Sequence, residues 1–152
     1  MTAQGLKRLE DELRLLKTTE RPAVIRAIAE ARSHGDLSEN AEYHAARERQ
    51  SFIEGRIAEL EEVTGAAEVI DPATLSGEHV KFGAQVKLVD EESDKETTYQ
   101  IVGMYEADIK LGLLSISSPL AKAMIGKKPG DTISVPAPGG DRSYEILSVR
   151  FG

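Results

Sequence analysis

The chain contains no cysteine and no tryptophan, and its aromatic residues are limited to four tyrosines and three phenylalanines. The absence of cysteine excludes a disulfide framework, thiol chemistry and a cysteine-based zinc site. The three histidines, His34, His44 and His79, are too scattered along the sequence to build a metal cage from histidine alone. A metal site made of cysteine and histidine is therefore not expected.

An excess of basic residues is also missing. The 152 residues include 19 Lys and Arg against 26 Asp and Glu, which gives a formal net charge of −7. Residues 1–70 carry 10 basic and 14 acidic side chains, and residues 71–152 carry 9 and 12. Neither half has the electrostatic character of a nucleic-acid-binding domain. If the protein meets nucleic acid, a partner must supply most of the phosphate contacts.

The third absence is that of long apolar runs. No run approaches the roughly 20 residues that cross a bilayer, and residues 1–5 lack the basic patch and apolar core of a signal peptide. We therefore expect a soluble, cytoplasmic protein. The length suits one ordinary domain or two small ones, and the apolar pattern favours a rod followed by a compact unit.

Two stretches of the first half carry apolar residues at alternating steps of three and four, which is a heptad seam. The first seam consists of Leu6, Leu9, Leu13 and Leu16, and resumes after Pro22 with Val24, Ala27, Ile28 and Ala31. The second consists of Tyr43, Ala46, Gln50, Ile53, Ile57, Leu60 and Thr64. Two matching seams joined by a short turn bury each other by folding back antiparallel. We predict an antiparallel coiled coil over residues 1–75, with its tip at 33–40.

Several residues predict details of these helices. Thr2 is suited to cap the first helix, and Gly5 indicates close packing early in it. Pro22 removes a helical hydrogen bond, so we expect a kink or local break near residues 18–21. Gly35 is placed to end the first helix in a left-handed conformation. The second helix should begin between positions 36 and 39 and end near Thr64.

The second half has a different sequence pattern, with short β-prone runs separated by Gly, Pro and acidic clusters. The predicted strands are 68–70, 84–89, 97–105, 113–117, 132–135 and 144–151. Residues 90–95 are predicted to form a hairpin loop, and residues 118–126 a short helix with Ser at its cap and Gly at its end. After a linker at 71–77, residues 76–152 should form a small second domain, so the fold class is α+β.

The tip contains two carboxylates, Asp36 and Glu39, and their spacing has two interpretations. Asp-x-x-Glu at the start of a helix is a capping-box pattern, in which both acids satisfy backbone N–H groups. Alternatively, two carboxylates at the end of a rod present oxygen ligands to Mg²⁺ and complete a site half built elsewhere. The nearby Arg32 and Arg47 are either solvated ion-pair partners or phosphate contacts.

The tip sequence closely resembles that of the GreA/GreB family of bacterial transcript cleavage factors. The resemblance is strongest over residues 31–48, ARSHGDLSENAEYHAARE, and it extends over the entire chain. It includes Thr2-x-x-Gly5, Arg21-Pro22, Gly83-Ala84-x-Val86, the run 115–121, Gly126 and Gly130-Asp131. Ser33 and Ser38 depart from the family pattern, because these positions are more often charged.

The resemblance implies a coiled-coil finger joined to a C-terminal domain of FKBP-like fold, acting as a monomer. The finger enters the secondary channel of RNA polymerase and helps to bind the second Mg²⁺ of its active site. Backtracked RNA is then cut near its 3′ end by the polymerase, so the factor itself is not an enzyme. On this resemblance Asp36 is a metal ligand, and Glu39 is a ligand or a residue that orients and activates the attacking water.

The resemblance also assigns residues outside the acid pair. Arg32 and Arg47 match a small basic spot that contacts RNA near its 3′ end. Ser117, Ser118, Pro119 and Leu120 match the segment that docks on the polymerase rim at the channel mouth. From the residues alone, this segment is a helix cap with a core contact, and both interpretations can hold together. We predict no prolyl isomerase activity, because few aromatic residues are present to line a proline pocket.

Two other function classes compete with a cleavage factor. A channel-occupying inhibitor of RNA polymerase with the same fold would block substrate entry without aiding cleavage. A plain interaction module would use the coiled coil to recruit a partner, with Asp36 and Glu39 serving only as caps. Asp36→Asn discriminates the last case, because Asn caps a helix about as well as Asp.

Overall fold

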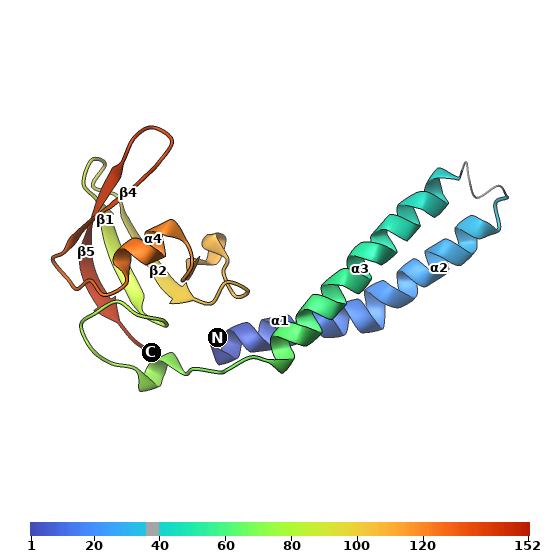
Figure 1. The fold of residues 1–152 in the computed structure, drawn as a ribbon, viewed down its shortest axis with the longest axis horizontal. Coiled ribbons are helices and arrows are strands. Elements are labelled where there is room, and N and C mark those ends of the chain that lie inside the picture. The colour runs from blue at the N-terminus through green and yellow to red at the C-terminus, as the bar shows by residue number, and fades with distance from the viewer. Residues whose placement is uncertain (36–39) are drawn as a thin grey trace. The chain divides into compact units, whose positions relative to one another are not determined.

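The computed structural model describes residues 1–35 and 40–152 (Figure 1). Residues 6–67 form one compact unit, called the hairpin below, and residues 1–5 with 68–152 form a second, called the sheet unit. The predicted division at residue 75 differs from these units because Met1 contacts the segment after the hairpin. Its amino group donates to the Glu68 carbonyl at 2.7 Å, and its carbonyl accepts from the Ile70 N–H at 2.8 Å.

The hairpin contains α1 (Ala3–Leu15), the π-helical turn η1 (Leu16–Glu20), α2 (Arg21–Arg32) and α3 (Ala41–Gly65). Helices α2 and α3 lie side by side and run in opposite directions (Figure 1). The buried apolar residues fall on the two seams: Leu9, Leu16, Val24, Ile28, Ala31, Ala46, Ile53, Ile57 and Leu60. The predicted antiparallel helical hairpin is confirmed. Within residues 1–35 and 40–152, no helix combines the length and apolar character needed to cross a membrane.

The break predicted before Pro22 is the π-helical turn η1, in which the Arg21 N–H donates to the Leu16 carbonyl. A seven-residue repeat continued from the buried Leu9 and Leu16 would next bury position 23. The buried residue is instead Val24, which is fully inaccessible. A π-helical turn accommodates one extra residue, so η1 absorbs the shift and the seam continues beyond it.

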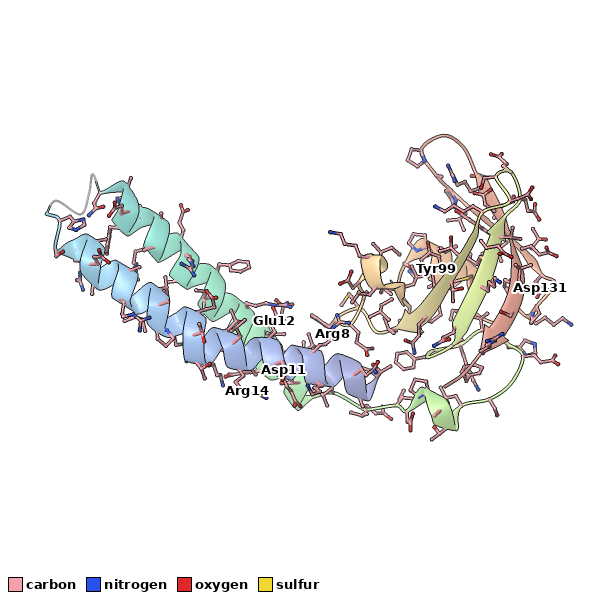
Figure 2. The ribbon with its side chains drawn as sticks, turned by 180° about the vertical axis from the view of Figure 1, so that it is seen from behind. Arg8, Asp11, Glu12, Arg14, Tyr99 and Asp131 are labelled. Atoms are coloured by element: carbon pink, nitrogen blue, oxygen red, sulfur yellow. The ribbon has the colours of Figure 1, made fainter. Side chains whose placement is uncertain are left out.

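Ion pairs cross from the first arm of the hairpin to α3. They are Glu12–Arg56, Lys17–Glu61, Glu20–Arg49 and Arg21–Glu54, with N···O distances of 2.5 to 2.9 Å. Glu12 leaves α1 on a different side from Asp11 and Arg14, which pair with each other along the helix (Figure 2). Because these pairs are largely solvated, each contributes little stability. Together they favour one alignment of the first arm against α3.

In the part of the chain that the structure describes, the sheet has five strands in the order β3–β2–β1–β5–β4. Their bounds are β1 (Gln85–Asp90), β2 (Glu96–Val102), β3 (Leu113–Ser115), β4 (Thr132–Val135) and β5 (Arg142–Arg150). Strand β3 runs parallel to β2, and the other neighbours are antiparallel. The short helix α4 (Pro119–Met124) packs on the sheet, and single 3-10 turns occur at η2 (Pro72–Thr74) and η3 (Ile109–Leu111). This mixed sheet with one short helix confirms the predicted α+β class, and the FKBP-like assignment stays a prediction.

One core fills the space between the sheet and α4. Its buried members are Val80, Ala84, Val86, Leu88, Ile101, Leu114, Ala121, Met124, Ile133 and Ile146. Tyr99 of β2 packs against this core and is labelled in Figure 2. In β1 the buried side chains alternate with half-buried ones, which is the pattern of a strand with one covered face.

Three predicted strands need correction. Residues 68–70 are not a strand, because they bond the backbone of Met1 instead of a sheet neighbour. Strand β2 ends at Val102 rather than at position 105, because the Gly103 N–H donates to the Glu106 carboxylate at 2.7 Å. Strand β3 ends at Ser115, where the chain turns toward α4.

The carboxylate of Glu106 ties the first residues of the chain to the sheet unit. Glu106 is only 1% exposed, and it accepts the Thr2 N–H at 2.7 Å and contacts the Thr2 hydroxyl. That hydroxyl accepts the Gly5 N–H at 3.0 Å, which confirms Thr2 as the cap of α1. A Cβ atom at Gly5 would collide with the Glu106 carboxylate. The close packing predicted from Gly5 is therefore confirmed.

Candidate functional site

The distal end of the hairpin is built from the last turn of α2 and the first turn of α3. Helix α2 ends at Arg32, and Gly35 has the positive φ (+111°) predicted for it. Helix α3 begins at Ala41, because Asn40 has extended backbone and its side chain accepts the Tyr43 N–H at 3.0 Å. The predicted helix start between positions 36 and 39 is therefore wrong.

The predicted metal ligands Asp36 and Glu39 lie outside the described residues, as do Leu37 and Ser38. Among residues 1–35 and 40–152, no group of three or more His, Asp or Glu side chains is placed to hold a metal ion. The assignment of Asp36 and Glu39 to Mg²⁺ therefore stays a prediction. Its chemical basis is the donor set itself, since two carboxylates are hard oxygen ligands.

Arg32 and Arg47 lie on the two arms beside the tip. Both are exposed, and both line one shallow groove together with Ile25, Ile28, Ala29 and Gln50. Among the residues that the structure describes, neither arginine forms an ion pair. The ion-pair interpretation is thus not supported, and both guanidinium groups remain available to an anionic ligand.

A further contact links the arms beside the tip. The Nδ1 atom of His34 lies 3.4 Å from the Glu42 carboxylate in the first turn of α3. Tyr43 is half-buried, as expected for a seam residue, and its ring meets His44 edge to face with centroids 5.6 Å apart. A negative side chain such as Glu42 is favourable at a helix N-terminus. These polar and aromatic side chains make up the described surroundings of the tip segment.

Sequence reasoning missed Asn40 as the residue that ends the tip. Besides capping α3, its side-chain amide donates to the Ala31 carbonyl of α2 at 2.6 Å. Asn is a favoured N-cap residue, so the signal was present. Asp36 and Ser38 are favoured at the same position, however, so residue preference alone did not select among the three.

The second predicted site lies at the start of α4. Ser118 caps this helix by accepting the Ala121 N–H at 3.2 Å, and its hydroxyl donates to the Ser115 carbonyl at 2.7 Å. Leu120 is half-buried and packs against the core. The cap-and-core interpretation is therefore confirmed for these two residues. Ser117 and Pro119 are exposed, so part of the segment is accessible to a partner.

The segment before Ser117 exposes more apolar surface than the sequence suggested. Met104, Ile109 and Leu111 are 60 to 65% exposed, and Tyr105 and Ile116 are just under 40% exposed. The sequence signal is weak, because the β-prone pattern predicts a strand that continues over residues 103–105. The strand ends early and leaves Met104, Tyr105, Ile109 and Leu111 in the connection between β2 and β3, while Ile116 follows β3.

Comparison with known proteins places the whole chain in one family. The family described as "Transcription elongation factor, N-terminal" matches residues 1–69, and "Transcription elongation factor, GreA/GreB, C-term" matches residues 75–151. The chain is 80% identical to the transcription elongation factor GreA of Acidiphilium cryptum, over 100% of this chain and 97% of the relative. It is 67% identical to that of Rhodospirillum rubrum, with the same coverage. The chain belongs to the GreA/GreB family of transcription elongation factors.

Proposed function

We propose that this chain stimulates the RNA-cleaving activity of RNA polymerase and does not cut RNA itself. The hairpin enters the secondary channel of a backtracked polymerase, and Asp36 and Glu39 reach the polymerase active site. Cleavage leaves a new RNA 3′ end, from which the arrested complex resumes elongation. The chain acts as a monomer in the cytoplasm, where bacterial transcription takes place.

The observation that carries this proposal is the capping of α3 by Asn40. The N-cap position is occupied by Asn40, whose side chain holds the Tyr43 N–H. Helix α3 therefore does not require Asp36 as its cap, which removes the main structural explanation for the acid pair. A role in the active site of a partner is the better explanation for the two acids in the sequence between α2 and α3.

Asp36 and Glu39 have the ligand chemistry that Mg²⁺ prefers. This ion usually keeps several waters and takes further ligands from phosphates and other acids, so two carboxylates complete a shared site and do not form a tight one alone. When bound, Mg²⁺ supplies the positive charge that activates water and stabilises a leaving oxygen. Asp36 is the proposed ligand, and Glu39 is a second ligand or holds the attacking water. The isolated chain should consequently have no nuclease activity.

Arg32 and Arg47 are proposed to contact the RNA near its 3′ end. Both side chains are exposed in one groove that spans α2 and α3, and within the described residues neither is engaged by a carboxylate. Guanidinium groups bind phosphate with charge-assisted hydrogen bonds. The overall charge of −7 limits non-specific RNA binding, so these contacts should operate only inside the complex with polymerase.

The sheet unit is proposed to dock on the rim of the polymerase channel through residues 117–120. Ser117 and Pro119 are exposed there, while Ser118 and Leu120 fix the local backbone through the cap and the core. Docking through this segment is independent of the tip chemistry. A variant of the tip should therefore keep its affinity for polymerase.

The test is RNA cleavage in a backtracked complex of bacterial RNA polymerase. Asp36→Asn and Glu39→Gln should each lower the stimulated cleavage rate at least about tenfold, as expected when metal ligation is altered, at unchanged polymerase binding. Glu62→Gln, an exposed residue on α3, makes the same charge change and should cleave like the unmodified protein. Near-normal cleavage by both tip variants would end the metal-donation proposal.

The same assay separates the competing functions. A channel-occupying inhibitor would slow nucleotide addition without raising cleavage, and this alternative is not favoured, because the relatives at 80% and 67% identity are named transcription elongation factors. A plain interaction module would be unaffected by Asp36→Asn.

A further inference from the structure

Asn40 joins the two helix ends on either side of the acidic segment. Its Oδ1 atom accepts the Tyr43 N–H at 3.0 Å in the first turn of α3. Its Nδ2 group donates to the Ala31 carbonyl at 2.6 Å in the last turn of α2. One half-buried side chain therefore bonds both arms of the hairpin at once.

Both groups that Asn40 meets belong to the set that a helix leaves unsatisfied. The first N–H groups and the last carbonyls of a helix lack partners within it, and both kinds need an external one. Ala31 is 2% exposed, and its carbonyl also accepts the His34 N–H at 3.2 Å. Since the acceptor lies in the last turn of α2 and the donor in the first turn of α3, the bridge of Asn40 fixes the separation of the two helix ends.

Few side chains can make this bridge. Asparagine has a carbonyl acceptor and an amide donor on a short stem, whereas ionised aspartate has acceptors only. Aspartate and serine still cap a helix about as well as asparagine. The two halves of the bridge can therefore be separated by substitution. Asp keeps the cap but has no donor for the bond to α2, and Ser keeps the cap on a side chain that is shorter than the Asn amide and does not span to α2.

We propose that Asn40 is a positioning residue that holds the end of α2 and the start of α3 at one separation. This inference rests on the proposed function of Asp36 and Glu39, because its purpose is to present those acids to the polymerase. Fixing both ends of a short segment lowers the entropy that must be lost when its side chains bind. Without the bond to α2, the acids need a higher Mg²⁺ concentration to reach the same cleavage rate.

The experiment measures stimulated cleavage against Mg²⁺ concentration for Asn40→Ser and Asn40→Asp. Each should raise the Mg²⁺ concentration for half-maximal cleavage roughly three- to tenfold, the range that one hydrogen bond commonly contributes. Affinity for polymerase, measured by competition, should not change. Hydrogen exchange of the Tyr43 amide should stay slow in both variants, which verifies that the cap is kept.

A matched control separates positioning from helix stability. Ala45→Gly changes an exposed position in the same turn of α3 and weakens the helix by about as much as a lost cap, without touching the bridge. It should leave the Mg²⁺ dependence unchanged. An equal shift in Ala45→Gly and Asn40→Ser would overturn the proposal in favour of a purely structural role.

The remaining outcomes are also decisive. If Asp36→Asn is inactive while Asn40→Ser keeps the normal Mg²⁺ dependence, Asn40 is a helix cap only, and the positioning proposal is wrong while the proposed function stands. If Asp36→Asn cleaves normally, the proposed function itself fails, and the positioning proposal fails with it.

Discussion

The hairpin and the sheet unit bury their apolar residues in different geometries. In the hairpin, the buried side chains form a row along two seams, and the flanks remain open to solvent, with Phe52 72% exposed. In the sheet unit, β1, β2, β5 and α4 enclose one shared core, where Leu88, Ile101, Met124 and Ile146 are at most 1% exposed. The hairpin is therefore a series of local layers, whereas the sheet unit depends on a single cluster.

This contrast also separates stability from the proposed chemistry. Arg32 and Arg47, which are proposed to contact RNA, lie at the end of the hairpin, where the last buried seam residues are Ala31 and Ala46. These small side chains bury little apolar area. Polar bridges such as those of Asn40 and His34 take the place of a core beside the tip.

The largest effect should come from matched core truncations in the two units. Leu60 of the hairpin and Leu88 of the sheet unit are both essentially inaccessible. Leu88→Ala should cost about 4 kcal/mol, because the enclosed core cannot collapse around the cavity, whereas Leu60→Ala should cost about 2.5 kcal/mol, because the open flanks can relax. Urea unfolding followed by amide signals from each unit measures both values. Equal losses, or a larger loss for Leu60, would contradict the contrast.

In a second pair of substitutions, the change in the free energy of unfolding should have opposite signs. Gly5→Ala places a Cβ atom against the buried Glu106 carboxylate, so it should destabilise the sheet unit by about 1 to 3 kcal/mol. Gly55→Ala meets no atom within 4 Å on the exposed side of α3, so it should stabilise the hairpin by about 0.5 to 1 kcal/mol. Thermal unfolding of both variants gives the test, and a neutral Gly5→Ala would show that Glu106 can move aside.

The smallest effect concerns the acid response of one carboxylate in each unit. A side-chain hydrogen bond from Arg21 lowers the pKa of Glu54, whereas the Glu92 N–H is the main cause of the lowered pKa of Asp90, with Arg142 secondary. Arg21→Gln should therefore return the pKa of Glu54 to its ordinary range. Arg142→Gln should leave the pKa of Asp90 still lowered. Carboxyl NMR titration measures both.

These lowered pKa values fix the direction of the pH dependence. Because each folded-state pKa lies below its unfolded value, each carboxylate contributes its full stability above about pH 5 and loses it as the pH falls through the folded pKa. Arg21→Gln should remove the hairpin's share of that acid sensitivity. A return of Asp90 to its ordinary pKa in Arg142→Gln would show that the arginine, not the backbone, is the main cause.

Much of the fold could be predicted from local patterns. The heptad spacing predicted the hairpin, Pro22 marked the irregular turn, and Ser118 with Gly126 marked the short helix. The errors came from contacts that local patterns do not contain. Residues 68–70 look like a strand but bond Met1, and β2 stops early because Glu106, four residues beyond its end, takes the Gly103 N–H.

The sequence predicted several residues of the candidate site, but it did not predict how they are arranged in space. Arg32 and Arg47 were selected from the sequence, but their shared groove depends on how the two arms align. Asn40 was missed because three good capping residues compete within the tip, and only the fold selects the one that also reaches Ala31. The assignments of Asp36 and Glu39 remain predictions.

The contact between Thr2 and Glu106 bears on the order in which the chain folds during synthesis. The two residues are 104 positions apart, whereas the hairpin has all of its own residues once position 67 has been made. Units of a chain generally fold as they emerge from the ribosome. The hairpin can therefore fold before Glu106, the partner of Thr2, has been synthesised. The first residues to be synthesised are thus among the last to form their native contacts.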